Sequence, residues 1–188
     1  MPDDGQHPDD DERPFPELLR DQIRHEFTAA QQYLAAAVYL DALRLPRLAG
    51  VCYGGAETKR DHALRMIRYL LDRDVPVAVG GLDEIVPSFE SARAAIEFML
   101  RREQWLSERV HALTRTAWET GDYVGEQFIQ WFQRGQLDEV ARMTTLLAVF
   151  DRPGGTLFDI EDFVTREMGI SRKQDPAAPG IAGKTRIR

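Results

Sequence analysis

The sequence has little of several features that define large classes of proteins. Its single cysteine, Cys52, excludes an internal disulfide and any metal site built from several cysteines. No stretch approaches the ~20 apolar residues of a membrane span, and the N-terminus lacks the basic segment and apolar run of a signal peptide. The formal charge of −7 argues against general binding to nucleic acid or anionic lipid, since both need a concentrated basic surface. We therefore expect a cytoplasmic protein without membrane or nucleic-acid partners.

The two ends of the chain differ in composition from its centre. Residues 1–13 are acidic and residues 171–188 are mostly basic, and both contain proline and glycine with few large apolar side chains. Such segments bury too little apolar surface to offset the entropy lost on ordering. We expect both to be disordered tails on one folded domain, residues 14–170.

Helical periodicity fills most of this domain. The first pattern starts after Pro14 and runs to about Leu45, where Pro46 is expected to break it. Later patterns cover about residues 47–74 and 88–120, with Ser88 as a helix cap, and then continue from the turn at 121–122 to about residue 151. A short fifth helix is expected over about 156–168, ended by Gly169. The apolar face expected for the first helix consists of Leu19, Ile23, Phe27, Ala30, Leu34, Val38 and Leu45.

The connections between these patterns predict the topology. Residues 75–89 hold two prolines and two glycines without a helical period, whereas the other connections are short. One long connection between the second and third helices is typical of one group of four-helix bundles. We predict an all-α, ferritin-like four-helix bundle with a short fifth helix.

Polar residues recur at core-facing positions with a repeated spacing. Glu26 precedes Lys59 by 33 residues and His62 by 36, and Glu103 precedes a second pair by the same two intervals. Residues three apart project from the same helix face, so each half of the bundle offers one group from one helix and two from the next. This is the plan of di-iron carboxylate centres, in which carboxylates neutralise and bridge the ions. The six positions are Glu26, Lys59, His62, Glu103, Gln136 and Glu139.

Several stretches resemble bacterial non-haem ferritins, most closely the actinobacterial type. They are HEFTAAQQYL (25–34), RDHA (60–63), LLDRD (70–74) and GDYVGEQFIQWF (121–132). The resemblance covers roughly residues 15–168. It implies a hollow 24-subunit shell that oxidises iron(II) and stores it as a ferric mineral.

The resemblance also assigns roles. Glu26 and His62 match ligands of the first iron, Glu103 matches a ligand shared by both irons, and Gln136 and Glu139 fall on the side of the second iron. Tyr33 matches a tyrosine beside the centre, although a plain core aromatic explains it nearly as well.

The departures from the family bear on activity. Lys59 stands where the family has a bridging glutamate, and its neighbours Glu57 and Asp61 face another way, about 200° around the helix. Gly135 replaces an outer iron-accepting glutamate. Arg60 stands where bacterioferritins have the methionine that binds haem, so no haem is expected. Animal light-chain ferritins resemble this chain in having a lysine at the position of Lys59.

Two positions of Lys59 lead to different functions. An inward ammonium pairs with the glutamates and opposes iron binding, whereas an outward one leaves Glu26 and His62 to hold a single ion.

The leading interpretation is an iron-storage shell subunit with weak or absent ferroxidase activity, as a homo-oligomer or mixed with an active ferritin chain. One alternative is a working ferroxidase. The other is a helical scaffold without iron handling, which glycines at 54, 55 and 135 suit.

Overall fold

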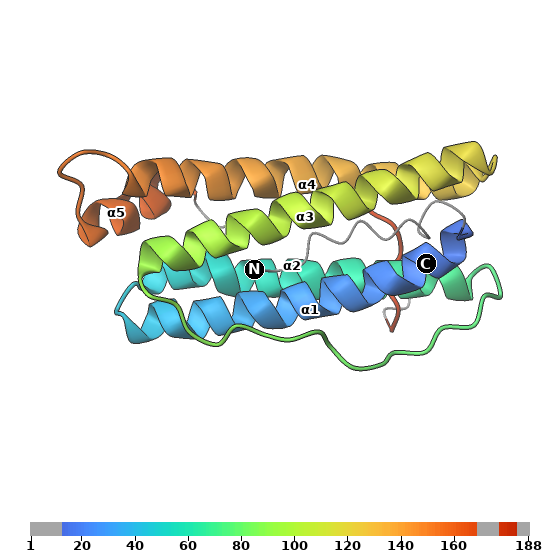
Figure 1. Ribbon diagram of the computed structural model, residues 1–188, viewed down its shortest axis with the longest axis horizontal. Coiled ribbons are helices and arrows are strands. Elements are labelled where there is room, and N and C mark those ends of the chain that lie inside the picture. Colours follow the sequence, from blue (N-terminus) through green and yellow to red (C-terminus); the bar gives the residue numbers. More distant parts are fainter. Residues whose placement is uncertain (1–12, 169–176, 184–188) are drawn as a thin grey trace.

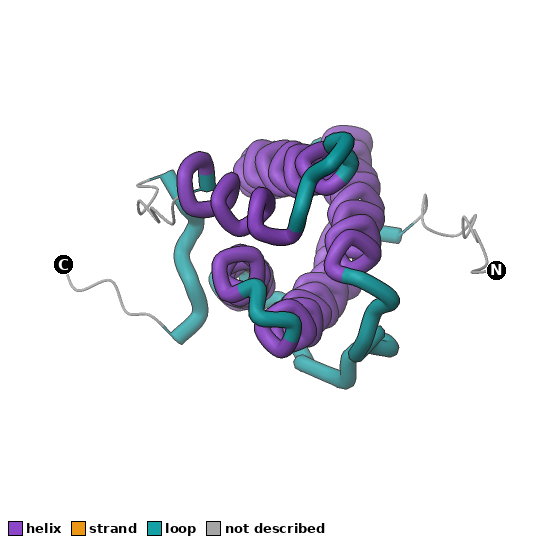
Figure 2. Tube along the Cα trace, turned by 90° about the vertical axis from the view of Figure 1, so that its left-hand side faces the viewer, coloured by secondary structure: helices purple, strands orange, loops and turns teal. Residues whose placement is uncertain are grey.

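The computed structural model describes residues 13–168 and 177–183, and within them the chain is all-helical. Four long helices pack side by side, as the end-on view in Figure 2 shows. The fifth helix lies at one end of the bundle, against the second and fourth (Figure 1). The helices are α1 (Phe15–Ala42), α2 (Pro46–Leu71), α3 (Ala92–Glu119), α4 (Tyr123–Phe150) and α5 (Leu157–Glu167). The predicted four-helix bundle with a short fifth helix is confirmed. None of the helices in the described ranges is long and apolar enough to cross a membrane.

The helix ends follow local chemistry that the sequence analysis placed only approximately. Ser91, and not the predicted Ser88, caps α3, because its hydroxyl accepts a hydrogen bond from the Ala94 amide at 3.0 Å. α1 ends three residues earlier than predicted, and Arg44 adopts a φ of 64° in the turn that follows. Pro46 is the first residue of α2, a position where proline costs no helical hydrogen bond. Gly169, predicted to end α5, lies outside the described residues.

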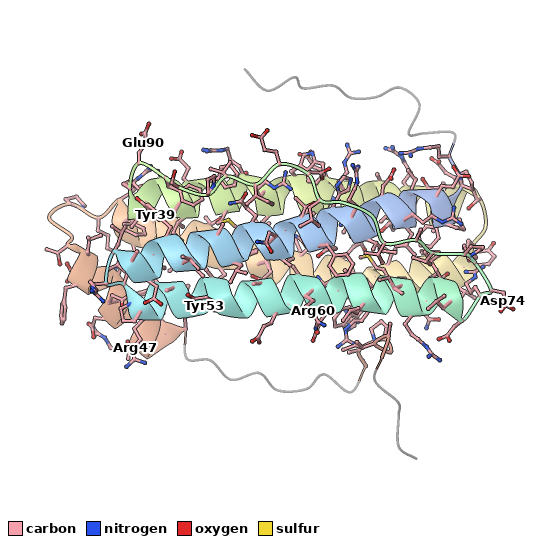
Figure 3. The ribbon with its side chains drawn as sticks, turned by 90° about the horizontal axis from the view of Figure 1, so that it is seen from below. Tyr39, Arg47, Tyr53, Arg60, Asp74 and Glu90 are labelled. Carbon is pink, nitrogen blue, oxygen red and sulfur yellow. The ribbon has the colours of Figure 1, made fainter. Side chains whose placement is uncertain are left out.

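The long connection between α2 and α3 runs the whole length of the bundle. Asp74 and Glu90, near its two ends, lie at opposite ends of the molecule (Figure 3). Hydrogen bonds tie it to α1: the Asp83 amide donates to the Thr28 hydroxyl at 3.1 Å, and Gln32 exchanges two bonds of 2.9 Å with the Val86 backbone. The crossover makes α2 and α3 parallel, while the short turns make α1 with α2 and α3 with α4 antiparallel.

The interior has a polar layer between two apolar clusters. One cluster, towards α5, includes Leu40, Cys52 and Met99, and the other includes Leu19 and Ile129 near the opposite end. The polar positions predicted from spacing fall between these clusters on every long helix.

The apolar face predicted for α1 is partly wrong. Leu19, Ile23 and Leu45 are buried, but Leu34 and Val38 are 39% and 55% exposed. The buried face instead passes through Glu26, Ala29 and Tyr33. Polar groups therefore occupy the core-facing row of α1, and some of its apolar residues face outward.

Part of the predicted C-terminal tail lies against α2. The Ala182 amide donates to the Leu64 carbonyl at 3.1 Å, and Arg65 donates to the Pro179 carbonyl. The rest of residues 171–188, and residues 1–12 of the predicted N-terminal tail, lie outside the described parts of the chain.

Candidate metal centre

Hydrogen bonds join one side chain from each of the four long helices in the polar layer. Tyr33 (α1), Lys59 (α2), Glu103 (α3) and Gln136 (α4) form this network, and each is at most 2% exposed. Burying so many polar groups is costly unless they pair with one another. The six positions predicted from spacing are all buried: Glu26, Lys59, His62, Glu103, Gln136 and Glu139.

The side chain of Lys59 points into the core, which is the first of the two positions described in the sequence analysis. Its ammonium lies 2.7 Å from Glu103 Oε2 and 3.3 Å from Gln136 Oε1, and the side chain is 1% exposed. Ammonium and carboxylate at this distance form a charge-assisted hydrogen bond. Lys59 therefore donates to the carboxylate that the sequence analysis predicts as a ligand shared by both irons.

Both oxygens of Glu103 are engaged by protein donors. The Tyr33 hydroxyl donates to Oε1 at 2.8 Å, and Lys59 and the Gln136 amide donate to Oε2. The Gln136 amide also donates to the Glu103 carbonyl at 3.0 Å, which fixes α4 against α3. Each carboxylate oxygen of Glu103 therefore accepts at least one hydrogen bond from a protein donor.

Glu26 and His62 are held by weaker contacts. The Gln22 amide donates to Glu26 Oε1 at 2.8 Å, while Glu26 Oε2 lies 3.3 Å from His62 Nδ1. Oε2 accepts no hydrogen bond from any group in the described part of the chain. His62 packs edge-on against Trp131 and Phe132, which restrict its ring.

Glu139 faces a second cation. Arg142 Nη1 lies 3.3 Å from Glu139 Oε1 and 3.4 Å from Oε2. Glu139 and Arg142 lie three residues apart on α4, so they share a helix face. All six predicted positions therefore lie in the polar layer. Hydrogen bonds join Lys59, Glu103 and Gln136, while Glu26 lies beside His62 and Glu139 pairs with Arg142.

Opposite charges in the centre stabilise the charged forms of Lys59 and Glu26 against the cost of burial. Burial alone would lower the pKa of Lys59, but the carboxylates of Glu103 and Glu26 outweigh it, and the pKa lies above its usual value. Burial alone would raise the pKa of Glu26, but Lys59 and His62 outweigh it, and the pKa lies below its usual value. Burial and the nearby Glu103 together hold the pKa of Tyr33 well above its usual value. At neutral pH the centre contains an ammonium, carboxylates and a neutral phenol.

Gly55 on α2 makes room for Tyr33. A Cβ at residue 55 would lie 2.6 Å from two ring carbons of Tyr33, whose ring is fully buried. At Gly54 the same atom would meet nothing within 4 Å. Gly55 therefore gives no support to the alternative of a helical scaffold, because this glycine lets the Tyr33 ring lie against α2.

The donor set does not fit a pair of bridged metal ions. Residue 59, the position that the resemblance assigns to a bridging glutamate, holds a cation, and protein donors hydrogen-bond to both carboxylate oxygens of Glu103. Among the described residues, no three His, Cys, Asp or Glu side chains are grouped so that they could hold one ion. This arrangement is a buried ion-pair network on the scaffold of a carboxylate metal centre.

Other notable features lie away from this network. A groove of about 410 Å³ lies between α1, α2 and the crossover, and none of the six site residues lines it. Arg60 also borders this groove and lies on the outer surface of α2 (Figure 3). The prediction that no haem binds there stays a prediction.

Sequence reasoning missed two residues of the centre, Gln22 and Arg142. Gln22 precedes Glu26 by four residues, and Arg142 follows Glu139 by three. Both intervals place a side chain beside its partner on one helix face, so scanning each site residue for such neighbours would have found them.

The fold and the buried carboxylates place the chain in a class of four-helix bundles in which side chains on facing helices can build a metal centre. Comparison with known proteins makes the assignment specific. A sequence model of the family described as "Ferritin-like domain" matches residues 16–152. This chain belongs to the ferritin-like domain family.

Curated relatives support this assignment. "Ferritin BfrB" of Mycolicibacterium smegmatis is 47% identical over 90% of this chain and 93% of its own length. "Bacterioferritin BfrB" of Mycobacterium tuberculosis is 45% identical over 88% and 90% of the two chains. "Bacterial non-heme ferritin" of Staphylococcus aureus is 28% identical over 73% and 83%. The resemblance to bacterial ferritins of the actinobacterial type is confirmed.

Solved structures support the fold. An open-pore ferritin from Archaeoglobus fulgidus superposes with a TM-score of 0.76 at 23% identity, covering 80% of this chain and 93% of its own. At this identity the similarity concerns the fold alone.

Proposed function

We propose that this protein is a subunit of an iron-storage shell whose two-metal centre is closed by an internal ion pair, so that it oxidises iron(II) weakly or not at all. Membership of the ferritin-like family and the names of the relatives support the shell and iron as its cargo. The observation that carries the closed centre is the contact of 2.7 Å between Lys59 and Glu103.

The charge of Lys59 is large enough to decide the outcome. At 4 Å and an effective dielectric constant of about 20, two unit charges interact by about 4 kcal/mol. Repulsion by an ammonium at that distance therefore raises the electrostatic free energy of a bound divalent ion by about 8 kcal/mol. A site with micromolar affinity provides about the same free energy of binding. In the absence of metal, the neighbouring carboxylates raise the pKa of Lys59, so an arriving ion meets a charged ammonium at neutral pH.

The same proposal covers assembly and location. The subunit forms a 24-subunit homo-oligomer in the cytoplasm, or enters mixed shells in which another ferritin chain oxidises the iron. Tyr33 is placed beside the centre as a hydrogen-bond donor to Glu103, and it stays protonated because of its raised pKa.

A working ferroxidase is the second candidate, and one contact favours it. Glu26 Oε2 is buried without a hydrogen bond from any described group and lies beside His62. This pair suits one ion, but the two-electron chemistry of a bridged pair needs the second half of the centre as well.

Iron(II) oxidation by the assembled protein tests the proposal. We expect the natural chain to oxidise iron(II) no faster than buffer in stopped-flow absorbance, and Lys59→Glu to accelerate oxidation. Arg60→Glu, which makes the same change of charge on the exposed face of α2, is the control for a change of surface charge. Rapid oxidation by the natural chain would support the working ferroxidase, and failure of both chains to form shells would support a scaffold.

A further inference from the structure

The second half of the centre holds two carboxylates that face two different cations. Lys59 lies against Glu103 in the interior, and Arg142 lies against Glu139 at the rim. The side chain of Glu139 is 10% exposed, whereas that of Arg142 is 41% exposed. The guanidinium thus covers a nearly buried carboxylate from the solvent side.

Glu26, the carboxylate of the first half, has no such cation against it, because Lys59 of the same half lies against Glu103. Glu26 accepts a hydrogen bond from the neutral amide of Gln22 and lies beside His62, which is charged only when protonated. No lysine or arginine in the described residues forms an ion pair with Glu26 within 4.0 Å.

We infer that Arg142 is a second cation of this centre, which pairs with Glu139 at the rim and, like Lys59 at Glu103, opposes a metal ion there. A guanidinium keeps its charge at every accessible pH and matches both oxygens of a carboxylate. A metal ion on this side needs the same oxygens and is repelled by the same charge. Replacing Lys59 alone therefore restores the bridge but leaves the second half of the centre partly closed.

The position of Arg142 explains why its effect is smaller than that of Lys59. Its side chain reaches solvent, where water and salt screen its charge, while Lys59 is enclosed. The inference rests on the proposed function, because it assumes that the site at Glu139 is a closed form of an iron(II) site.

Zinc binding to the assembled shell tests this inference without relying on oxidation. Zn²⁺ is redox-inert and accepts carboxylate and imidazole ligands. We compare the natural chain, Lys59→Glu, Arg142→Leu and the double variant by isothermal titration calorimetry. Lys59→Glu is expected to bind one Zn²⁺ per subunit tightly and a second weakly, and adding Arg142→Leu should strengthen the second site about ten-fold. Arg142→Leu alone should gain no site, because Lys59 still occupies Glu103.

Three controls assign the effect to this charge. Arg142→Lys in the Lys59→Glu background keeps the cation and should not strengthen the second site. Arg101→Leu removes an exposed arginine whose partner, Glu97, lies 3.5 Å away on the same helix, and should also leave it unchanged. Glu139→Ala in the double variant should abolish the second site. If Arg142→Leu prevents shell assembly, Arg142→Gln replaces it.

The outcomes separate this inference from the proposed function. Two equally tight zinc sites in Lys59→Glu, or the same gain from Arg101→Leu, would overturn the role of Arg142 alone. Two tight zinc sites in the natural chain would overturn the closed centre itself.

Discussion

The two halves of the polar centre repeat the same spacing along the chain but hold their carboxylates differently. In the α3–α4 half, Glu103 accepts hydrogen bonds from three side chains and Glu139 is paired with Arg142. In the α1–α2 half, one oxygen of Glu26 accepts no hydrogen bond from the described residues. Equal spacing therefore places side chains at one level of the bundle, but the chemistry of each position decides whether a carboxylate is free to bind an ion.

The difference has an energetic consequence. A buried ion pair with good geometry roughly offsets the cost of removing its charges from water, but removing one partner leaves an uncompensated charge. The α3–α4 half is therefore expected to be important for stability in the absence of metal, and the α1–α2 half less so.

Replacing each glutamate by glutamine gives the largest expected effect and compares the halves directly. Glu103→Gln leaves the Lys59 ammonium without its nearest carboxylate, and we expect a loss of about 3–5 kcal/mol in the free energy of unfolding. Glu26→Gln should cost about 1–3 kcal/mol, since one of its oxygens is already unpaired.

The measurement is the urea midpoint of the metal-free protein at one protein concentration. Glu108→Gln, an exposed glutamate on α3, is the control and should change little. Equal losses for Glu26→Gln and Glu103→Gln would remove the distinction between the halves.

The second prediction concerns Tyr33, which extends from α1 to Glu103 and so links the halves. Gly55→Ala places a methyl group against the buried ring and should destabilise the protein by about 1–3 kcal/mol. Gly54→Ala, one residue away with open space, should stabilise α2 by up to about 1 kcal/mol. Thermal unfolding of both variants tests this pair, and a stabilising Gly55→Ala would show that Tyr33 moves aside freely.

The smallest expected effect on stability comes from Cys52, which lies in the apolar cluster beside the polar centre. Cys52 lies two helical turns before Lys59 on α2, and burial raises the pKa of its thiol to about 12. The unfolded thiol loses its proton above about pH 9, so its contribution to stability is complete below that pH and falls as the pH rises.

Comparison with Cys52→Ala isolates this contribution. Between pH 8 and pH 10 the natural chain should lose about 1 kcal/mol more than the variant in urea unfolding. Lys59 and the tyrosines are present in both chains, so their titration cancels. Parallel pH profiles would indicate that the Cys52 thiol reaches solvent in the native state.

Much of the fold could be predicted from the sequence because it depends on local patterns. The helical periods, the short turns and the proline- and glycine-containing crossover predicted the bundle and its connectivity. The helix ends were less accurate: Ser88 and Ser91 are both suitable caps, and only the backbone path of the crossover selects Ser91. The apolar face of α1 was misplaced at Leu34 and Val38, because a polar core reverses the usual rule that apolar residues face inward.

The positions of the polar centre could be predicted from the sequence, but the contacts between its side chains could not. Repeated intervals identified the six buried polar positions, since spacing along helices fixes the level at which side chains enter the core. The roles of Gln22, Gly55 and Arg142 depend on rotamers and on neighbours from other helices, which the intervals do not specify.

The sequence by itself determined that this protein is a four-helix bundle with a buried polar layer, and that a cation replaces a carboxylate at residue 59. Only the tertiary structure decided that the cation points inward, because Glu103 and Gln136, distant in sequence, supply the acceptors that offset the cost of burying it. The tertiary structure likewise decided that the two halves differ, since hydrogen-bond donors from the three other long helices, α1, α2 and α4, meet at Glu103 and not at Glu26.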